Sequence, residues 1–226
     1  MKTFGRILTL FMTLGSLAFV QPAAAQEAPD AQVKRISQEA PDALVKRISQ
    51  EVLDLAKADK EIQAGNQNRV RALVEDKILP HVDFQHMTAL ASGPDWNQAT
   101  PEQQKQLTSE FRALLVYTYS GAIAQIKDQK VTFKPMHADP ATTEAEVRST
   151  VAQRRGELMQ LNYRLEKMAD GWKIYDINIS GAWLVEAYKS SFAAEIGKNG
   201  IDGLIKVLSN KNRQLAESAM KASKPG

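Results

Sequence analysis

The sequence predicts an α+β fold in which a helical N-terminal part precedes a curved, four-stranded antiparallel sheet wrapped by helices. Two observations support this prediction. Apolar residues recur about every 3.6 positions from Asp42 to about Ile126, which is typical of amphipathic helices. Near Lys130 the period changes to 2, which marks the start of a sheet, and helical spacing returns after Ser180.

The composition is that of an ordinary folded protein and excludes several classes. The chain has 226 residues, of which 43% are hydrophobic and 24% are charged, and it contains no cysteine. A disulfide scaffold, a thiolate metal site and a cysteine nucleophile are therefore excluded. The balance of residues also excludes wholesale disorder and a multi-span membrane protein.

The first 25 residues predict a cleavable signal peptide. Lys2 and Arg6 precede an apolar run over residues 7–20, and small residues at 23–25 suit a signal peptidase. The alternative, an uncleaved anchor, is disfavoured because a membrane span needs about 20 apolar residues. Two of the 29 basic residues leave with this segment, so 27 remain against 26 acidic ones. We therefore expect an exported, unanchored protein without a nucleic-acid partner.

A twelve-residue segment is duplicated directly after the signal peptide. Residues 26–37 recur at 38–49, and the copies differ only where Gln32 becomes Leu44. Only the second copy continues the apolar face of the helix that follows it. We therefore expect residues 26–40 to form a flexible lead-in and residues 41–226 to form a single domain.

Start and stop signals delimit the expected helices. Pro41 suits a helix start, Pro80 ends a helix, Asp83 caps a short one, and Thr100 with Gln103 forms a capping box. The expected helices are one that begins at Asp42, Asn68–Leu79, a short segment after Asp83, one from Thr100 to about Ile126, Leu184–Ile196, and one from Ile201 to about Met220.

Four strands are expected in series: Val131–His137, Ala145–Arg154, Leu158–Met168 and Trp172–Ser180. The third alternates cleanly between apolar and polar residues, as a strand with one buried face does. The fourth has apolar residues on both sides, so we expect it to be covered on both faces.

Catalytic motifs are absent from the sequence. It has no glycine-rich phosphate loop, no G-x-S-x-G elbow and no H-E-x-x-H motif. The spacing of His81, His86 and His137 disfavours a metal site. Asp176 is a lone carboxylate in an apolar strand, which suits either a general acid or base with a raised pKa or a hydrogen-bonded structural group. Its expected partner is Tyr163 or Arg164.

The interior of the cone formed by sheet and helices is either filled by side chains or hollow. Composition and spacing leave both possibilities open.

The order and spacing of several short motifs resemble the MlaC (toluene-tolerance Ttg2-type) family of periplasmic phospholipid-binding proteins. The matching segments cover residues from about 41 to 210 and are Leu79–Phe84 with Met87, Trp96 before the Thr100–Gln103 helix start, Phe111 to Tyr119, Asp170–Ile177, Gly181–Val185, Tyr188–Phe192 and Gly200–Ile205. The chain departs from the family pattern at Trp183 and in the duplication. Trp183 either narrows a pocket mouth or simply packs.

The resemblance implies an NTF2-like fold and a periplasmic carrier with no catalytic residues, no metal and no cofactor, whose cargo is a diacyl glycerophospholipid. The implied partners are an inner-membrane ABC transporter complex and an outer-membrane lipoprotein complex. We expect the acyl chains to contact apolar residues in the matched motifs and on inward faces, namely Phe84, Met87, Phe111, Leu115, Tyr119, Val147, Val151, Leu161, Tyr163, Ile174, Leu184, Tyr188 and Phe192. Tyr175 is the alternative to Ile174.

Two other functions remain open on the residues alone. One is an isomerase or hydratase of the same sheet type that uses Asp176. The other is a periplasmic adaptor with a filled core that binds no lipid.

Overall fold

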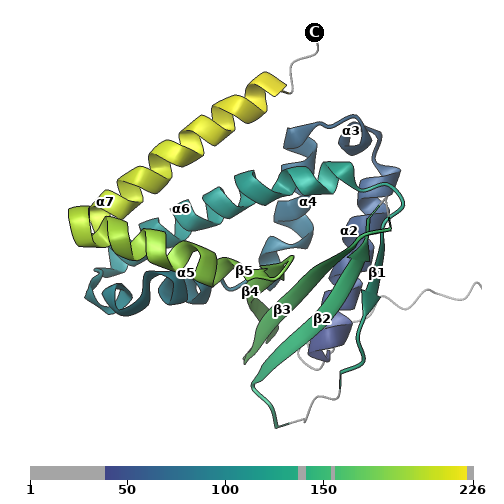
Figure 1. Cartoon of the computed structure of the whole chain (residues 1–226), viewed down its shortest axis with the longest axis horizontal. Helices are drawn as coiled ribbons and strands as arrows, with labels where there is room; N and C mark the ends of the chain where they lie inside the picture. The colour runs from purple at the N-terminus through teal and green to yellow at the C-terminus, as the bar shows by residue number, and fades with distance from the viewer. Residues whose placement is uncertain (1–38, 137–140, 154–155, 223–226) are drawn as a thin grey trace, which may run out of the picture.

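The computed structural model describes residues 39–136, 141–153 and 156–222 (Figure 1). The predicted signal peptide and most of the predicted lead-in lie outside these residues, as do His137 and Arg154, where two predicted strands end. Glu39 is described and contacts the first helix, because the Arg47 guanidinium donates hydrogen bonds of 2.9 and 2.8 Å to its carboxylate.

The described part of the chain is an α+β arrangement of helices around one antiparallel sheet. The helical elements are α2 (Pro41–Ala58), α3 (Lys60–Gln63), α4 (Gln67–Lys77), η1 (Leu79–His81), α5 (Phe84–Ser92), η2 (Gly93–Gln98), α6 (Pro101–Tyr119), η3 (Ser120–Gln125) and α7 (Leu184–Ala222). The strands are β1 (Lys130–Phe133), β2 (Glu144–Ala152), β3 (Leu158–Met168), β4 (Gly171–Ile179) and β5 (Ala182–Trp183).

The sheet has five strands in the order β1-β2-β3-β4-β5, so the prediction of four strands was wrong. The missed strand β5 is only two residues long and pairs Trp183 with Asn178 and Ala182 with Ile179. Ser180 and Gly181 turn the chain back with φ values of 53° and 94°. Two residues are too few to display a period, so only the turn signalled this strand.

The predicted helix starts are present, whereas one predicted helix end was wrong. The Thr100 side chain accepts a hydrogen bond from the Gln103 backbone, and the Gln103 side chain accepts one from the Thr100 backbone, which completes the capping box of α6. The Asp83 carboxylate accepts a hydrogen bond from the backbone N–H of His86 at 2.8 Å. The α-helix after Thr100 stops at Tyr119, and the chain continues to Gln125 as the 3-10 segment η3.

A β-bulge explains the mixed apolar pattern of β4. Arg164 pairs with Asp176 and Leu165 pairs with Ile174, so Tyr175 is an extra residue without a partner on β3. The extra residue reverses the alternation, which places Ile174 and Ile177 on the same face although they are an odd number of positions apart. As expected, β4 has buried residues on both faces: Ile174 is 3% exposed on one, and Asp176 and Asn178 are 2% and 4% exposed on the other.

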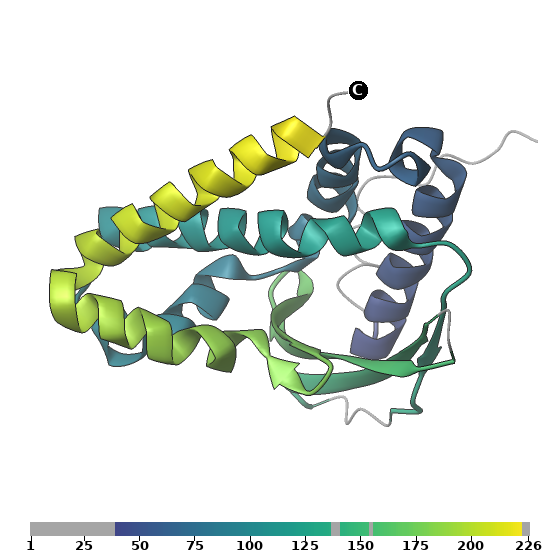
Figure 2. The same cartoon turned by 45° about the horizontal axis from the view of Figure 1, so that its top comes forward.

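The helix α7 consists of two helices that meet at Gly200, close to the two predicted. Gly200 has φ 68° and ψ −176°, a conformation that side-chain-bearing residues rarely adopt, and the second half turns back along α6 (Figure 1). In Figure 2 the helix α2 stands over the β1 end of the curved sheet, whereas α7 leaves from the β5 end.

Candidate functional site

Two clusters of buried apolar side chains form most of the interior. The helical cluster joins α5, α6 and α7, and the sheet cluster joins α2 to one face of β2, β3 and β4. The half-buried side chains of Val82 and Ile177 pack against both clusters. Ile177 therefore marks where the two clusters meet.

The structure divides the thirteen residues expected to line the pocket between these clusters. Eight belong to the helical cluster or pack against it: Met87, Phe111, Leu115, Leu184, Phe192, Phe84, Tyr119 and Tyr188. Four belong to the sheet cluster or pack against it: Val147, Tyr163, Ile174 and Leu161. Val151 is buried at 7% exposure and belongs to neither group. Only Phe84, Tyr119, Leu161 and Tyr188 are half-buried, and the other nine are core residues in this conformation.

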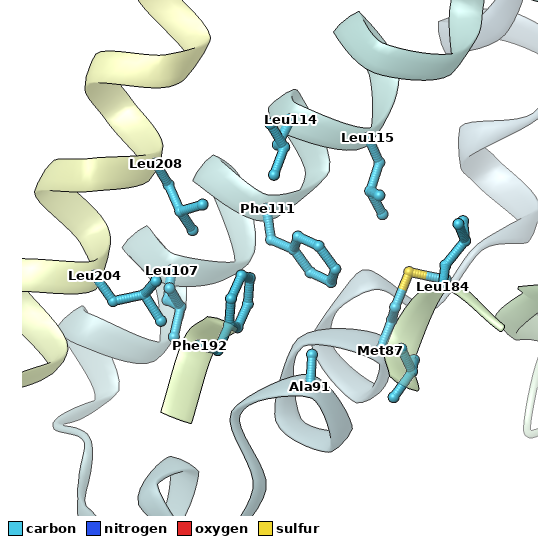
Figure 3. Close-up of a cluster of buried hydrophobic side chains, with 11 residues drawn as sticks. Met87, Ala91, Leu107, Phe111, Leu114, Leu115, Leu184, Phe192, Leu204 and Leu208 are labelled. Carbon is cyan, nitrogen blue, oxygen red and sulfur yellow. The ribbon is translucent and has the colours of Figure 1, made fainter. Parts of the chain in front are cut away.

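The helical cluster is tightly closed around three aromatic rings. The ring of Phe111 lies 5.0 Å from those of both Tyr188 and Phe192, in edge-to-face arrangements. Figure 3 shows Phe111 of α6 and Phe192 of α7 pointing toward each other, and their exposed fractions are 0% and 2%. Edge-to-face pairs of this kind add about 0.5–1.5 kcal/mol beyond their buried area.

The inner face of the sheet, by contrast, is only partly covered. Val147 and Tyr163 lie opposite each other on this face and are buried. Their neighbours Leu161, Ile177 and Ile179 point the same way according to the strand register, yet they stay half-buried. The helices therefore leave a strip of apolar sheet surface accessible beside Ile177.

The helix α6 changes its burial along one side. Phe111, Leu114 and Leu115 are buried on its inner side. Thr118 lies two helical turns after Phe111 and so shares this side, but it is exposed. The inner side of α6 thus loses its cover in the last turn, where Tyr119 is also only half-buried.

We call the half-buried residues Tyr119, Leu161, Ile177, Ile179 and Tyr188 the sheet–helix surface. They come from α6, β3, β4 and α7 and pack against the two buried clusters from outside. Sequence reasoning found three of them and missed Ile177 and Ile179. The apolar residues on both sides of the fourth strand could have indicated Ile177 and Ile179. Without the bulge, however, the sequence does not show that these residues lie on the same face as Ile174.

Tyrosine hydroxyls supply polarity near this apolar surface. Burial raises the pKa of Tyr188 to about 12, and the neighbouring Tyr119 adds to this rise. Burial also raises the pKa of Tyr163 to about 12, although Ser49 and Ser149 act in the opposite direction. Both phenols are therefore uncharged at any physiological pH.

Two cavities lie elsewhere and do not correspond to the expected acyl pocket. A cavity of about 200 Å³ lies between the start of α2, η1 and the first residues of β4, and His81, Trp172 and Lys173 are among its walls. A cavity of about 500 Å³ lies at the bend of α7 beside η2 and has mostly polar walls, including Asp95, Gln103 and Asp202. Neither touches any of the thirteen residues.

Asp176 lies on the outer face of the sheet, opposite the sheet–helix surface. Its carboxylate accepts hydrogen bonds from the backbone N–H groups of Ile177 (2.9 Å) and Val185 (3.1 Å), and Val185 is in the first turn of α7. Arg164 is the partner that the sequence left undecided, with its guanidinium 3.6 Å from the carboxylate. Burial raises the pKa of Asp176. Through these hydrogen bonds the carboxylate connects β4 to the start of α7.

Trp183 packs on the outer face of the sheet. The Arg164 guanidinium lies 3.8 Å from the centroid of its ring, a cation–π contact, and Trp183 pairs with Asn178 on β4. Of the two roles considered for Trp183, the structure has the packing role.

The described histidines make separate contacts. His86 stacks on Tyr175 with a ring distance of 4.6 Å, and its Nδ1 is 2.6 Å from the Glu166 carboxylate. His81 lies in η1, where burial and the charges of Arg47 and Lys173 lower its pKa. Within residues 39–136, 141–153 and 156–222, no three potential metal-ligating side chains lie close enough to hold an ion. In the same ranges, no helix is both long and apolar enough to cross a membrane.

Comparison with known proteins identifies the family. Residues 46–210 match the sequence model described as "MlaC protein". The chain belongs to the MlaC family.

Solved and curated MlaC relatives extend this finding. A phospholipid-binding protein from Ralstonia solanacearum, solved in complex with a phospholipid, is 46% identical, with a TM-score of 0.73; the match covers 77% of this chain and 98% of that one. Toluene tolerance protein Ttg2D of Pseudomonas putida is 26% identical over 147 residues, which are 65% of this chain and 68% of the relative. The intermembrane phospholipid transport system binding protein MlaC of Haemophilus influenzae is 23% identical over 141 residues, 61% of this chain and 66% of the relative.

Proposed function

We propose that this MlaC-family protein is a periplasmic carrier that binds the acyl chains of a diacyl glycerophospholipid along the sheet–helix surface. The observation that carries the proposal is the 46% identical relative with a phospholipid bound, because the match covers nearly all of that chain. The half-buried apolar residues of β3, β4, α6 and α7 supply a surface of the right chemistry. In this proposal phospholipid is cargo, and no cofactor takes part.

The cost of exposing acyl chains explains why such a carrier is needed. Two chains carry about 30 methylene groups, so at about 0.8 kcal/mol each their transfer into water costs on the order of 24 kcal/mol. Spontaneous crossing of an aqueous compartment is negligible at this cost. A carrier needs to hold the acyl chains only about as favourably as the bilayer does, since much tighter binding would prevent their release.

The finer parts of the proposal concern location and partners. The signal peptide that the sequence predicts over residues 1–25 supports export to the periplasm. The family supports exchange of lipid with an inner-membrane ABC transporter complex and an outer-membrane lipoprotein complex, and an NTF2-like cone as the frame of the site. The phosphate would lie near the solvent, with little selection among head groups.

The lipid content of the purified protein tests this function. The full chain with its leader is produced in a bacterial host that has a periplasm, purified from the periplasmic fraction without detergent, and extracted with organic solvent. We expect mass spectrometry to find diacyl phospholipid in an amount comparable to the protein. An extract free of phospholipid would contradict the proposed function.

A pair of substitutions on α6 locates the site. Thr118→Asp places a charge on the uncovered inner side of α6, where acyl chains would have to cover it, so we expect at least a tenfold loss of bound lipid. Ser109→Asp places the same charge at an exposed position on the same helix, away from that side. This control should keep the wild-type lipid content, and equal losses in both variants would place the lipid elsewhere.

A further inference from the structure

The strand β1 is an open edge of the sheet. Among the strands that the structure describes, it is the first in the sheet order and pairs with β2 alone. Figure 2 shows this edge at the end of the sheet away from α7. An edge strand presents backbone N–H and C=O groups with which another strand can pair.

The register of β1 and β2 determines which backbone groups lie at this edge. In an antiparallel pair, alternate residues exchange backbone hydrogen bonds with the neighbouring strand. The N–H of Lys134 donates to the carbonyl of Arg148 at 2.9 Å, so Thr132, two residues earlier, also faces β2. The N–H and C=O groups of Val131 and Phe133 then point away from β2. In the described part of the chain, no other backbone group outside the strand pairing takes them up.

The side chains along this edge form one apolar row and one basic row. Val131 and Phe133 are half-buried and point to the inner face of the sheet, where Phe133 packs against the sheet cluster. Lys130, Thr132 and Lys134 point to the outer face and are exposed. A strand added at this edge would therefore meet apolar side chains on one face and ammonium groups on the other.

The two lysines of the basic row carry charge that no acidic side chain offsets among the described residues. No ion pair within residues 39–136, 141–153 and 156–222 includes Lys130 or Lys134. Arg148, which lies across from Lys134 on β2, is 2.7 Å from the carboxylate of Glu146. The unpaired positive charge is thus concentrated on β1, at the edge itself.

This charge disfavours a second copy of the chain as the occupant of the edge. If two β1 strands paired antiparallel about Thr132, each Lys130 would lie opposite a Lys134 of the other copy. Like charges that lie directly opposite each other in a sheet are destabilising, and lysines on edge strands oppose self-association in this way. A strand with acidic side chains at the same positions is instead attracted.

We propose that the edge of β1 binds an extended segment of another protein in which acidic residues alternate with apolar ones. The backbone of the segment pairs with Val131 and Phe133, as in other cases of strand addition. Its acidic side chains lie beside Lys130 and Lys134, and its apolar side chains extend the inner face of the sheet. The edge does not include the sheet–helix surface, so the inference does not depend on the proposed function.

Two short peptides of equal length test the charge preference. Both carry a fluorescent label and alternate valine with a charged residue, which is glutamate in one peptide and lysine in the other. At low ionic strength, we expect fluorescence anisotropy to show that the full chain binds the glutamate peptide at least about tenfold more tightly. Lys130→Glu together with Lys134→Glu should reverse this preference.

Lys206→Glu together with Lys211→Glu is the matched control. Both lysines are exposed on α7, and this variant changes the net charge by the same amount as the β1 variant. It should keep the wild-type preference for the glutamate peptide. An equal loss of preference in the two variants would show that the overall charge attracts the peptide, and the inference would be overturned.

Backbone methylation of the glutamate peptide tests strand pairing. Alternate N–H groups of an added strand face β1, so N-methylation of one alternate set should abolish binding, whereas methylation of the other set should change the affinity by less than about threefold. Binding that survives both methylations would overturn the inference, and so would equal wild-type affinities for the glutamate and lysine peptides. The lipid content of the β1 variant should equal that of the wild type, so either of these failures leaves the proposed function standing.

Discussion

The middle of α6 and its C-terminal end share one side of the helix but meet different surroundings. Around Phe111 this side is sealed by α5 and α7, and the exposed fraction of the ring is 0%. Around Thr118, two turns later, the same side is exposed, and the adjacent Tyr119 is only half-buried. The middle of the helix supplies stability, and its C-terminal end leaves surface accessible to a ligand. One helix thus serves as both scaffold and binding surface.

The largest expected effect on stability comes from a substitution in the buried helical cluster. Phe111→Ala removes a ring that contacts two other aromatic rings, and we expect the free energy of unfolding to fall by about 3–5 kcal/mol. Chemical denaturation measures this loss. The variant should keep its lipid content per folded molecule at temperatures where it is still folded.

Ile179→Ala is the opposite case, because Ile179 belongs to the sheet–helix surface and not to a buried cluster. Ile179 is half-buried, so we expect a loss of only about 1–2 kcal/mol of stability together with a clear loss of bound lipid. If Phe111→Ala depletes lipid while Ile179→Ala leaves it unchanged, the division between scaffold and binding surface is wrong.

A smaller effect is expected where the sheet joins α7. Asp176→Ala leaves the N–H groups of Ile177 and Val185 without an acceptor, and we expect a loss of about 1–3 kcal/mol at neutral pH. Asp176→Asn keeps an acceptor oxygen and should lose less. Lipid content should change with neither substitution at temperatures where the protein is folded.

The pH dependence of Asp176 has a defined sign. Its pKa is raised above 3.8 in the folded state, so its contribution to stability is fully present below that value and is lost as the pH rises through the raised pKa. The stability of wild type relative to Asp176→Asn should therefore fall over this pH range. A relative stability that rises with pH would show that Arg164 outweighs burial.

The smallest effect is expected from the duplication. Deletion of residues 26–37 leaves the second copy to supply Glu39 and the start of α2 unchanged. We expect the free energy of unfolding to stay within about 0.5 kcal/mol of wild type, with lipid content unaltered. A marked loss of either would assign a role to the first copy.

Local signals predicted most of the fold. The capping box at Thr100 and Gln103, the cap at Asp83 and the bend near Gly200 each depend on a few neighbouring residues, so the sequence displays them directly. Strand β5 and the bulge at Tyr175 depend on pairing with another strand, which no local period reveals.

The site was predicted less well for the same reason. The apolar residue types were predicted correctly, but their burial depends on which elements cover them. Phe111 and Tyr119 both belong to the apolar stripe of one helix, yet Phe111 is buried and Tyr119 is half-buried. The partner of Asp176 required the register that only the assembled sheet supplies.

The bulge at Tyr175 has a consequence for how this surface can vary. The extra residue determines to which face of the sheet each side chain from Asp176 to Ser180 points. Deletion of that residue would therefore exchange the apolar and the polar faces of this part of β4. Ile177 and Ile179 would then face outward, while Asp176 would be withdrawn from α7. The chemistry of the cargo surface is therefore encoded in the spacing of the chain as much as in its side chains.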